Sequence, residues 1–452
     1  MTRVSRMVTL VALMIALVAP VWAADSAPAV KEWTIAVFLN ADNNLDPYGV
    51  EDQKEMSKVG SSDWLNIVTL IDRERGPACY NYIEKGKITK VKDMGELDMG
   101  DYKLFVDFAK YVVANYPAKH YVFTMWNHGS GWKLGNQSPI SRGISYDDSS
   151  NNHITTNQLA VALKEVKNIV GHNIDILNFD ACLMQMAEVI YACKDTVDYI
   201  VASEETEPGK GTPYDDVLTT LTKTSTSEAF AKSWTKAFIK SYSGGSQGNE
   251  DCTQSAIKVA AMGPVFDAMN GLAKATISGK YNAEYKAAIQ KTQAFAYPEN
   301  IDLLHLASLL KAAIKDESIK TACDKVTEAC AAAIIENGNA GYAMKNAKGL
   351  AVYMPSDFCI EGAYTALDFC KNSLWDDMIF DLAKKTRAAG LVASVEKGDL
   401  SSLRGYVAAS SKDSPEVKKF IVQELNFRLH SEAGLAESLK AEASALVSEL
   451  NK

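Results

Sequence analysis

Five runs of consecutive apolar residues, each of the length of a strand, alternate along the chain with segments of helical periodicity. A strand that lacks polar alternation is buried on both faces, and such strands occur in parallel sheets that helices cover on each side. The pattern therefore predicts an α/β protein with a mainly parallel sheet flanked by helices. The five predicted strands span residues 33–40, 66–72, 120–126, 174–179 and 199–203.

The second half of the chain is predicted to be mainly helical. Residues 212–334 read as a helical insertion that contains one short strand near 256–261. Two later apolar segments, 341–344 and 349–355, are expected to rejoin the sheet as strands. A helix over 373–384 then closes a main domain of residues 32–385. Residues 386–452 shift to Ala, Ser, Glu, Lys and Leu, which predicts a small C-terminal helical appendage.

The N-terminus has the pattern of a secretory signal peptide. Arg3 and Arg6 precede an uncharged, largely aliphatic run that ends in small residues near Ala23. A membrane anchor is the alternative, but the aliphatic core of about 13 residues falls short of the roughly 20 that span a bilayer. We predict a signal peptide over 1–23, a linker over 24–31, export to the periplasm or the exterior, and no membrane span after signal removal.

Charge limits the partners of the exported chain. The full chain of 452 residues has a formal net charge of −9, and loss of Arg3 and Arg6 changes it to −11. An acidic protein without a basic run is a poor partner for nucleic acid or an anionic membrane. We expect neither as a partner, and we expect a monomer.

Eight cysteines are present, and an exported protein normally pairs its cysteines. If one cysteine stays a thiol for chemistry, the remaining seven cannot all pair. Cys323 and Cys330 lie seven residues apart on one predicted helix, which places them about 10 Å apart and too far to bridge. The count therefore points to free thiols.

Two reactive side chains follow directly on predicted strands. His128 comes after the third strand and Cys182 after the fourth. Because ligands bind beyond the carboxyl ends of parallel strands, adjacent strands would bring these side chains within reach of each other. His128 would act as general base and acid, and a helix starting just after Cys182 would favour its thiolate. The N–H groups of Gly129 and Cys182 are the candidate oxyanion donors.

Five segments resemble the clostripain family of cysteine peptidases, and they occur in the order found in that family. Together they extend over roughly residues 32–384, which leaves the appendage uncovered. The segments are Ala36 to Leu45 (AVFLNADNNL), Trp126 to Trp132 (WNHGSGW), Phe179 to Met184 (FDACLM), Ala202 to Gly209 (ASEETEPG) and Gly349 to Pro355 (GLAVYMP).

The resemblance implies a caspase-like fold and a cysteine endopeptidase that works through a thioester acyl-enzyme. His128 and Cys182 match the catalytic dyad of the family, which cleaves protein or peptide substrates after Arg or Lys. Asp180 matches the acidic residue at the floor of the S1 pocket, where a carboxylate would pair with a basic side chain. Capping of the following helix is the alternative role for Asp180.

Lys210 departs from the family pattern because it lies in the loop that lines the pocket. If its ammonium group points into the pocket, it repels basic side chains, and if it points to solvent, nothing changes. Glu204, Glu205 and Glu207 are further candidates for pocket charge, although a solvated acidic loop is the favoured interpretation. Two other functions stay open: a caspase-like peptidase of non-basic specificity, and an inactive secreted binding protein of the same fold.

Family members are often zymogens that are cut between the two dyad residues, and Arg142 lies where that cut would fall. It is the only arginine between His128 and Cys182, and the lysines between them are weaker candidates. No cofactor is expected to be required, and no histidine has metal-ligand spacing. The resemblance leaves room for calcium, for which Asp147 and Asp148 are the candidate ligands.

Overall fold

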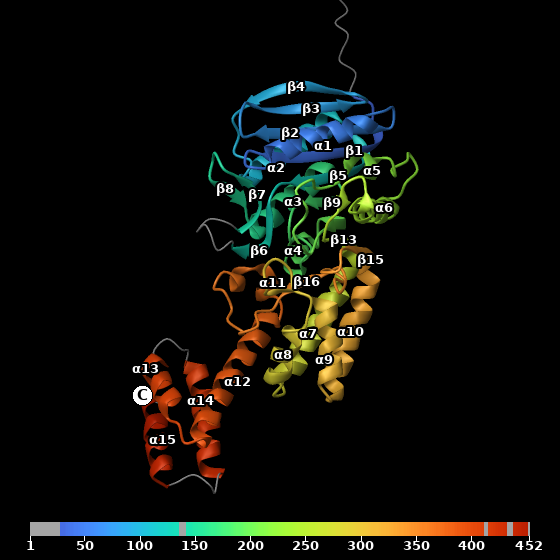
Figure 1. Ribbon diagram of the computed structural model, residues 1–452. Coiled ribbons are helices and arrows are strands. Elements are labelled where there is room, and N and C mark those ends of the chain that lie inside the picture. The colour runs from blue at the N-terminus through green and yellow to red at the C-terminus, as the bar shows by residue number, and fades with distance from the viewer. Residues whose placement is uncertain (1–27, 135–141, 411–414, 432–436, 451–452) are drawn as a thin grey trace, which may run out of the picture.

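A nine-stranded sheet forms the centre of the molecule (Figure 1). The computed structural model describes residues 28–134, 142–410, 415–431 and 437–450, so the predicted signal peptide lies outside the described residues. The order across the sheet is β15 (Ile334–Ala340), β13 (Cys252–Lys258), β10 (Val197–Ala202), β9 (Ile174–Asp180), β5 (Ala118–Trp126), β1 (Lys31–Ala41), β2 (Leu65–Arg73), β3 (Ala78–Glu84) and β4 (Lys87–Gly95).

The five predicted strands form the parallel centre of this sheet, from β10 through β9, β5 and β1 to β2. Antiparallel strands extend it at both edges, with β3 and β4 beyond β2 and with β13 and β15 beyond β10. The short strand expected near 256–261 is β13, which begins four residues earlier. The prediction of a mainly parallel sheet is confirmed.

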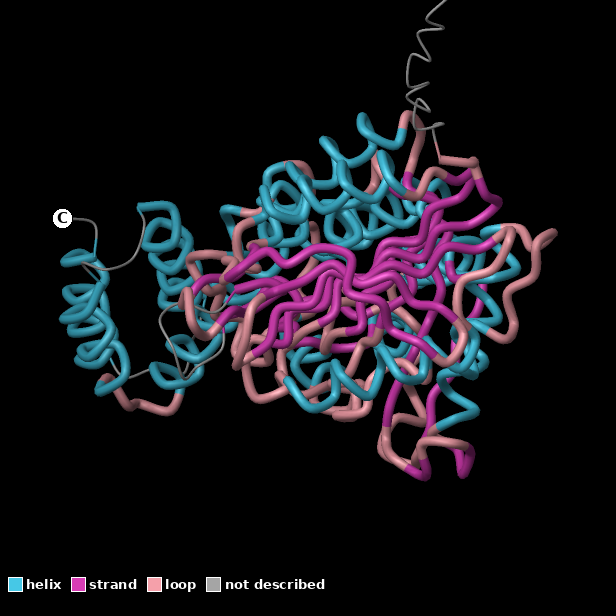
Figure 2. The backbone as a smooth tube through the Cα atoms, turned by 90° about the horizontal axis from the view of Figure 1, so that it is seen from above, coloured by secondary structure: helices cyan, strands magenta, loops and turns pink. Residues whose placement is uncertain are grey.

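Helices cover both faces of the sheet, as Figure 2 shows from above. Alternate residues of β1 enter different cores: Ala36 and Phe38 pack with one set of helices, and Ile35, Val37 and Leu39 with the other. This two-sided burial explains why the strand has no polar alternation. The first set contains α2 (Tyr102–Asn115), α3 (Thr156–Val170) and α4 (Ala187–Cys193), and the second contains α1 (Asp46–Val59), α5 (Tyr214–Leu218) and α6 (Ser227–Ser241).

The helical insertion packs beyond the β13 and β15 edge of the sheet (Figure 1). Its apolar residues continue the larger of the two cores, which explains how it is held to the sheet. The predicted insertion of residues 212–334 is therefore divided: α5 and α6 cover a face of the sheet, and only its later part packs beyond the edge, as η1 (Val259–Ala261), α7 (Met262–Ile277), α8 (Asn282–Ile289), α9 (Leu303–Ala313) and α10 (Glu317–Ala333).

The two late strands do not rejoin the sheet, and that prediction is wrong. Residues 341–344 form a turn, because β15 ends at Ala340 and Gly341 has a φ of 78°. In the other segment, β16 (Ala351–Tyr353) pairs with β14 (Asn300–Asp302) in a separate two-stranded sheet. The N–H groups of Gly349 and Tyr353 are taken by the carboxylates of Glu204 and Glu188 at 2.9 Å each. The apolar run is buried because it packs in the core, and it does not pair with a strand of the large sheet.

Two further small sheets occur in segments whose sequence is polar. After His128 the chain forms β6 (Gly129–Leu134), β7 (Arg142–Asp147) and β8 (Asn152–Ile154), which pair antiparallel. The segment after α6 folds into a hairpin of β11 (Ser243–Gly245) and β12 (Gly248–Asn249). Both lie outside the large sheet.

Helix α12 (Trp375–Glu396) runs through the expected end of the main domain at residue 385. Its first half packs into the large core and its second half into a separate apolar cluster with the C-terminal helices. The connecting and terminal elements are η2 (Tyr364–Ala366), α11 (Asp368–Lys371), α13 (Ser401–Ala409), α14 (Pro415–Ser431) and α15 (Glu437–Leu450). No helix within the described ranges is both long and apolar enough to cross a bilayer.

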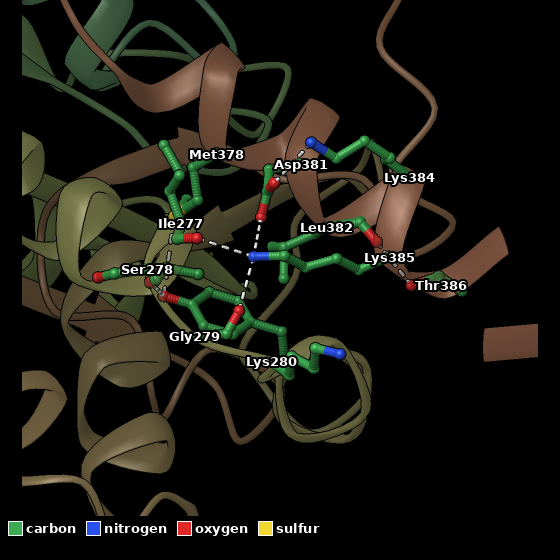
Figure 3. A network of polar contacts seen from close by, with 12 residues as sticks. Ile277, Ser278, Gly279, Lys280, Met378, Asp381, Leu382, Lys384, Lys385 and Thr386 are labelled. Atoms are coloured by element: carbon green, nitrogen blue, oxygen red, sulfur yellow. Dashed lines mark hydrogen bonds and ion pairs between the residues drawn. The ribbon is translucent and has the colours of Figure 1, made fainter. Parts of the chain in front are cut away.

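A lysine at the midpoint of α12 fastens this helix to the end of α7 (Figure 3). The Nζ of Lys385 donates to the carbonyl oxygens of Ile277 at 2.8 Å and Gly279 at 2.6 Å. It also forms an ion pair with Asp381, which in turn is 3.1 Å from Lys384. Ile277 is the last residue of α7 and Gly279 lies two residues beyond it, so Lys385 caps the carboxyl end of this helix and anchors the joint to the appendage.

Candidate active site

His128 and Cys182 lie at neighbouring strand ends on the carboxyl edge of the sheet. In the sheet, Trp126 of β5 lies opposite Asp180 of β9. His128 and Cys182 each come two residues after this pair, so the two residues leave the sheet at the same level. The Asn127 N–H donates to the Asp180 carbonyl at 3.2 Å and holds the two ends together. A Cβ on Gly129 would lie 2.4 Å from the Cys182 carbonyl oxygen, so only glycine permits this approach.

Cys182 occupies a tight turn between β9 and α4. Leu183, the next residue, has a φ of 65°, a strained value for a leucine, and its N–H donates to the Glu205 carbonyl at 3.1 Å. The Glu207 N–H donates to the Cys182 sulfur at 3.3 Å. The predicted helix directly after Cys182 is wrong, since α4 begins only at Ala187. Backbone N–H groups, not a helix dipole, therefore surround the sulfur.

Burial keeps both members of the pair neutral near pH 7. It raises the pKa of the Cys182 thiol, against the opposing effect of the N–H groups of Glu207, Gly129 and Cys182 itself. It lowers the pKa of His128, with a smaller opposing effect from the Asp148 carboxylate. A neutral thiol and a neutral imidazole at neighbouring strand ends call for general-base removal of the thiol proton. Both predicted oxyanion donors, Gly129 and Cys182, have their N–H groups close to the sulfur.

The imidazole of His128 is in contact with Asn44, a residue for which the sequence predicted no role at this site. The Nε2 atom of His128 lies 2.7 Å from Oδ1 of Asn44, in the turn between β1 and α1. Asn44 lies inside the resembling segment of residues 36–45, which is the signal that could have drawn attention to it.

Asp180 forms a buried pair of carboxyl groups with Glu207 beneath the Cys182 turn. Asp180 accepts hydrogen bonds from the Thr212 N–H at 3.0 Å and from the Tyr214 hydroxyl at 2.8 Å. Burial raises the pKa of Asp180, whereas the hydrogen bond from Glu207 lowers it. Burial and the nearby charge of Asp180 hold the pKa of Glu207 well above its usual range. Both pKa values are raised, so the two carboxyl groups titrate as a pair and hold a shared proton more tightly than exposed carboxyl groups would.

Acceptor oxygens without donors gather at this pair. Within the described part of the chain, Oε2 of Glu207 and Oε1 of Gln254 are buried and have no hydrogen-bond donor. Gln254 itself donates from Nε2 to Oε1 of Glu207 at 3.3 Å. Oε1 of Gln254, and the Glu207 carboxylate once it is ionised, can each accept an N–H group of a ligand.

The acidic loop after β10 is not solvated, so that interpretation is wrong. Glu204 is 1% exposed and accepts the Gly349 N–H, and Glu205 accepts the N–H groups of Thr206 and Ala296. Lys210 directs its Nζ to the Gln247 carbonyl oxygen in the β11–β12 turn, at 3.4 Å. Its ammonium group therefore points to this turn and not to the Asp180–Glu207 pair.

Arg142 is the first residue of β7, and the preceding residue, Ser141, lies outside the described residues. The next residue, Gly143, is buried, and its N–H donates to Oγ of Ser130 at 3.1 Å. The two candidate calcium ligands have different surroundings. Both carboxylate oxygens of Asp147 accept backbone N–H groups, from Met99 and Ser150, whereas the charge of Asp148 raises the pKa of His128. No group of three acidic, Cys or His side chains in the described ranges is arranged to hold a metal.

All eight cysteines lie within the described residues and none is paired. Five of them are buried in the apolar cores. Cys323 and Cys330 are both on α10, as the sequence predicted.

The fold and the strand-end cysteine and histidine define a caspase-like α/β protein with a thiol site at the carboxyl edge of its sheet. The sequence profile of the clostripain family matches residues 37–382, and the chain belongs to this family. Clostripain of Hathewaya histolytica is 30% identical over 221 residues, which are 41% of each chain, so the matched region spans about two fifths of that relative.

Two solved structures share the fold. A secreted C11 cysteine protease from Bacteroides thetaiotaomicron, in complex with an irreversible peptide inhibitor, has a TM-score of 0.59 at 20% identity. An inactive zymogen C11 protease from Parabacteroides distasonis has a TM-score of 0.59 at 19% identity. The matches cover 77% and 76% of this chain and 99% of each of the others. At this identity the likeness establishes the fold of the main domain.

Proposed function

We propose that this protein is an exported cysteine endopeptidase that cleaves peptide bonds after Arg or Lys. Membership of the clostripain family supports the reaction class. The observation that carries the specificity is the buried Asp180–Glu207 pair, with its acceptor oxygens, beneath the Cys182 turn.

The proposed reaction begins with transfer of the Cys182 thiol proton to His128 while the sulfur attacks the substrate carbonyl carbon. The N–H groups of Gly129 and Cys182 would stabilise the oxyanion that forms. His128 then gives its proton to the departing amine, which leaves a thioester on Cys182. Water, deprotonated by His128, hydrolyses the thioester and restores the free thiol.

A peptide library that varies only the residue before the scissile bond tests this function. We expect a strong preference for Arg or Lys over every neutral residue, since a cation in the pocket replaces the proton of the carboxyl pair. Equal turnover of all residues, or an acidic preference, would support the non-basic alternative. Complete inactivity, together with no reaction of Cys182 with a basic acyloxymethyl ketone, would support a binding protein instead.

Binding of a basic side chain is expected to release about one proton, because the cation lowers the raised pKa of Glu207. Glu207 is protonated in the free protein below its raised pKa and ionised in the complex. Affinity for basic ligands therefore rises with pH until Glu207 ionises in the free protein as well. Calorimetry of an arginine-based competitive inhibitor in buffers of different ionisation enthalpy measures the proton count. An uncharged citrulline analogue is the control and should release none.

Self-activation by cleavage after Arg142 is the second part of the proposal. Gly143 fits closely in β7, where a Cβ would lie 2.0 Å from the Ile154 carbonyl oxygen. The bond after Arg142 must leave this strand before any active site can hold it, so we expect processing to be slower than hydrolysis of peptides.

Arg142→Gln is expected to keep the chain in one piece while the wild-type protein converts to two fragments. Glutamine keeps much of the length of arginine but carries no charge for the proposed pocket. Intact mass over a time course measures the conversion, and Lys133→Gln is the matched variant that should still be cut. Cleavage of Arg142→Gln at the wild-type rate, or an active wild-type enzyme that stays whole, would overturn the assignment.

We propose export through the N-terminal signal and proteins or peptides as partners. Calcium stays an optional cofactor in this proposal, to be tested by activity after chelation. The monomeric state is likewise a proposal, and light scattering of the purified protein would measure it.

A further inference from the structure

The side chain of Asn44 contacts one nitrogen of the His128 ring. Its Oδ1 lies 2.7 Å from Nε2 of His128. A carbonyl oxygen only accepts hydrogen bonds, so this contact requires a proton on Nε2. In a neutral imidazole the other nitrogen, Nδ1, is then unprotonated and is the only ring atom able to accept a proton.

Asn44 is held in place by a network of asparagines that joins three strands. The neighbouring Asn43 accepts the Leu45 N–H at 2.9 Å and donates to the Tyr146 carbonyl at 3.0 Å. Asn127, directly before His128, donates to the Asn40 carbonyl at 2.7 Å and accepts the Tyr146 N–H at 2.7 Å. These bonds join the ends of β1, β5 and β7, so they connect the turn that carries Asn44 to the loop that carries His128.

We propose that Asn44 is a positioning residue, which orients the His128 imidazole so that Nδ1 accepts the Cys182 proton. This inference rests on the proposed peptidase function. In the acylation step the S–H bond breaks, an S–C bond to the substrate forms, and the proton goes to Nδ1. The resulting imidazolium keeps its Nε2 proton on Asn44 and returns the Nδ1 proton to the leaving amine.

An uncharged acceptor suits this position better than a carboxylate. The groups that act on the pKa of His128 are burial, which lowers it, and the exposed Asp148 carboxylate, which raises it slightly. A second carboxylate at position 44 would stabilise the imidazolium further and remove the neutral base at mildly acidic pH. The uncharged amide of Asn44 orients the ring without stabilising the imidazolium in this way.

Asn44→Ala is expected to lower kcat by about 10- to 100-fold with little change in KM, because a free imidazole flips and loses part of the general-base effect. Asn44→Asp restores the acceptor. We expect it to recover most of kcat at alkaline pH and to move the acidic limb of the pH profile to higher pH. Steady-state kinetics on an arginine peptide from pH 5 to pH 9 measures both effects.

Asn43→Ala is the matched control, since it loosens the same turn without touching His128. It is expected to lower the melting temperature and to leave the position of the acidic limb unchanged. If Asn44 served only the turn, Asn44→Ala and Asn43→Ala would behave alike, and Asn44→Asp would leave the pH profile of the wild type intact. Either result overturns the inference.

Ring ¹⁵N shifts of His128 report the tautomer without any need for turnover. We expect the Nε2-protonated form in the wild type and in Cys182→Ala, and a mixture of both tautomers in Asn44→Ala. An inactive wild-type protein with the Nε2 tautomer would count against the proposed function and not against the role of Asn44. An active wild-type protein whose tautomer does not respond to Asn44→Ala would count against the role of Asn44 alone.

Discussion

Cys182→Ala is expected to abolish peptide hydrolysis, with a loss in kcat/KM of at least about 10⁴-fold. The sulfur is the only atom of the proposed site that forms a covalent bond to the substrate, so nothing nearby replaces it. The turn is held by the Leu183 N–H, which donates to the Glu205 carbonyl and is unaffected by alanine, so only the Glu207 N–H loses its acceptor, the sulfur. Turnover of an arginine peptide and the melting temperature, measured on the same preparation, separate loss of chemistry from loss of fold.

Cys359→Ala is the matched control, because Cys359 is an exposed thiol within the main domain. It is expected to keep wild-type activity and to leave labelling by a basic acyloxymethyl ketone on Cys182 unchanged. Cys182→Ala should lose that labelling altogether. If Cys182→Ala kept more than a few per cent of activity while Cys359→Ala lost it, the nucleophile would have been assigned to the wrong cysteine.

The pH dependence of the wild-type enzyme follows from the neutral state of the pair. His128 must be unprotonated to accept the thiol proton, and burial lowers its pKa below the usual value. Activity is therefore retained to a lower pH than an exposed histidine would allow and falls as pH drops through this lowered pKa. The raised pKa of Cys182 means that uncharged thiol reagents should react slowly with the resting protein at pH 7.

The centre of the fold could be predicted from the sequence because β1, β5 and β9 are buried on both faces, and such strands leave a continuous apolar run. The site could be located for a related reason. His128 and Cys182 stand where two of these runs stop, and the ends of adjacent parallel strands meet at one edge. Local patterns of this kind need no knowledge of distant contacts.

The remaining parts of the site depend on contacts between distant residues. Glu207 lies in an acidic loop that would be solvated in isolation, and its burial results from Gln254 on β13 and from Asp180 on β9. Asn44 reaches His128 across the β1 and β5 ends, 84 residues away in sequence. Residues 349–355 read as a core strand, although their N–H groups are used by Glu204, Gln185 and Glu188. In each case a tertiary partner overrides the local pattern.

Asp180→Asn is expected to lower kcat/KM for arginine peptides by about 10²- to 10³-fold, the usual effect of removing one partner from a buried charge pair. Asparagine still accepts the Thr212 N–H, so the turn keeps its shape, but it no longer offers a negative charge to the guanidinium. A peptide with citrulline in place of arginine has the same shape without the charge. Its slow turnover should be nearly unaffected, so the ratio of the two substrates measures the charge alone.

Asp215→Asn is the matched control, because Asp215 follows Tyr214 on α5 and its carboxylate pairs with Lys58 at 2.6 Å. It should leave the ratio of arginine to citrulline turnover unchanged. Equal losses on both substrates in Asp180→Asn would instead mean that Asp180 supports the Cys182 turn and does not bind the substrate.

Glu207→Gln completes the test, because Asp180 and Glu207 share one proton in the free protein and act on the cation as a unit. Removal of either carboxyl group leaves the other free to ionise, so each single variant should keep part of the preference for arginine. Residues that act as a unit give non-additive effects. The loss of the arginine preference in the double variant should therefore differ from the product of the losses in the two single variants. A loss equal to that product would show that the two carboxyl groups act independently.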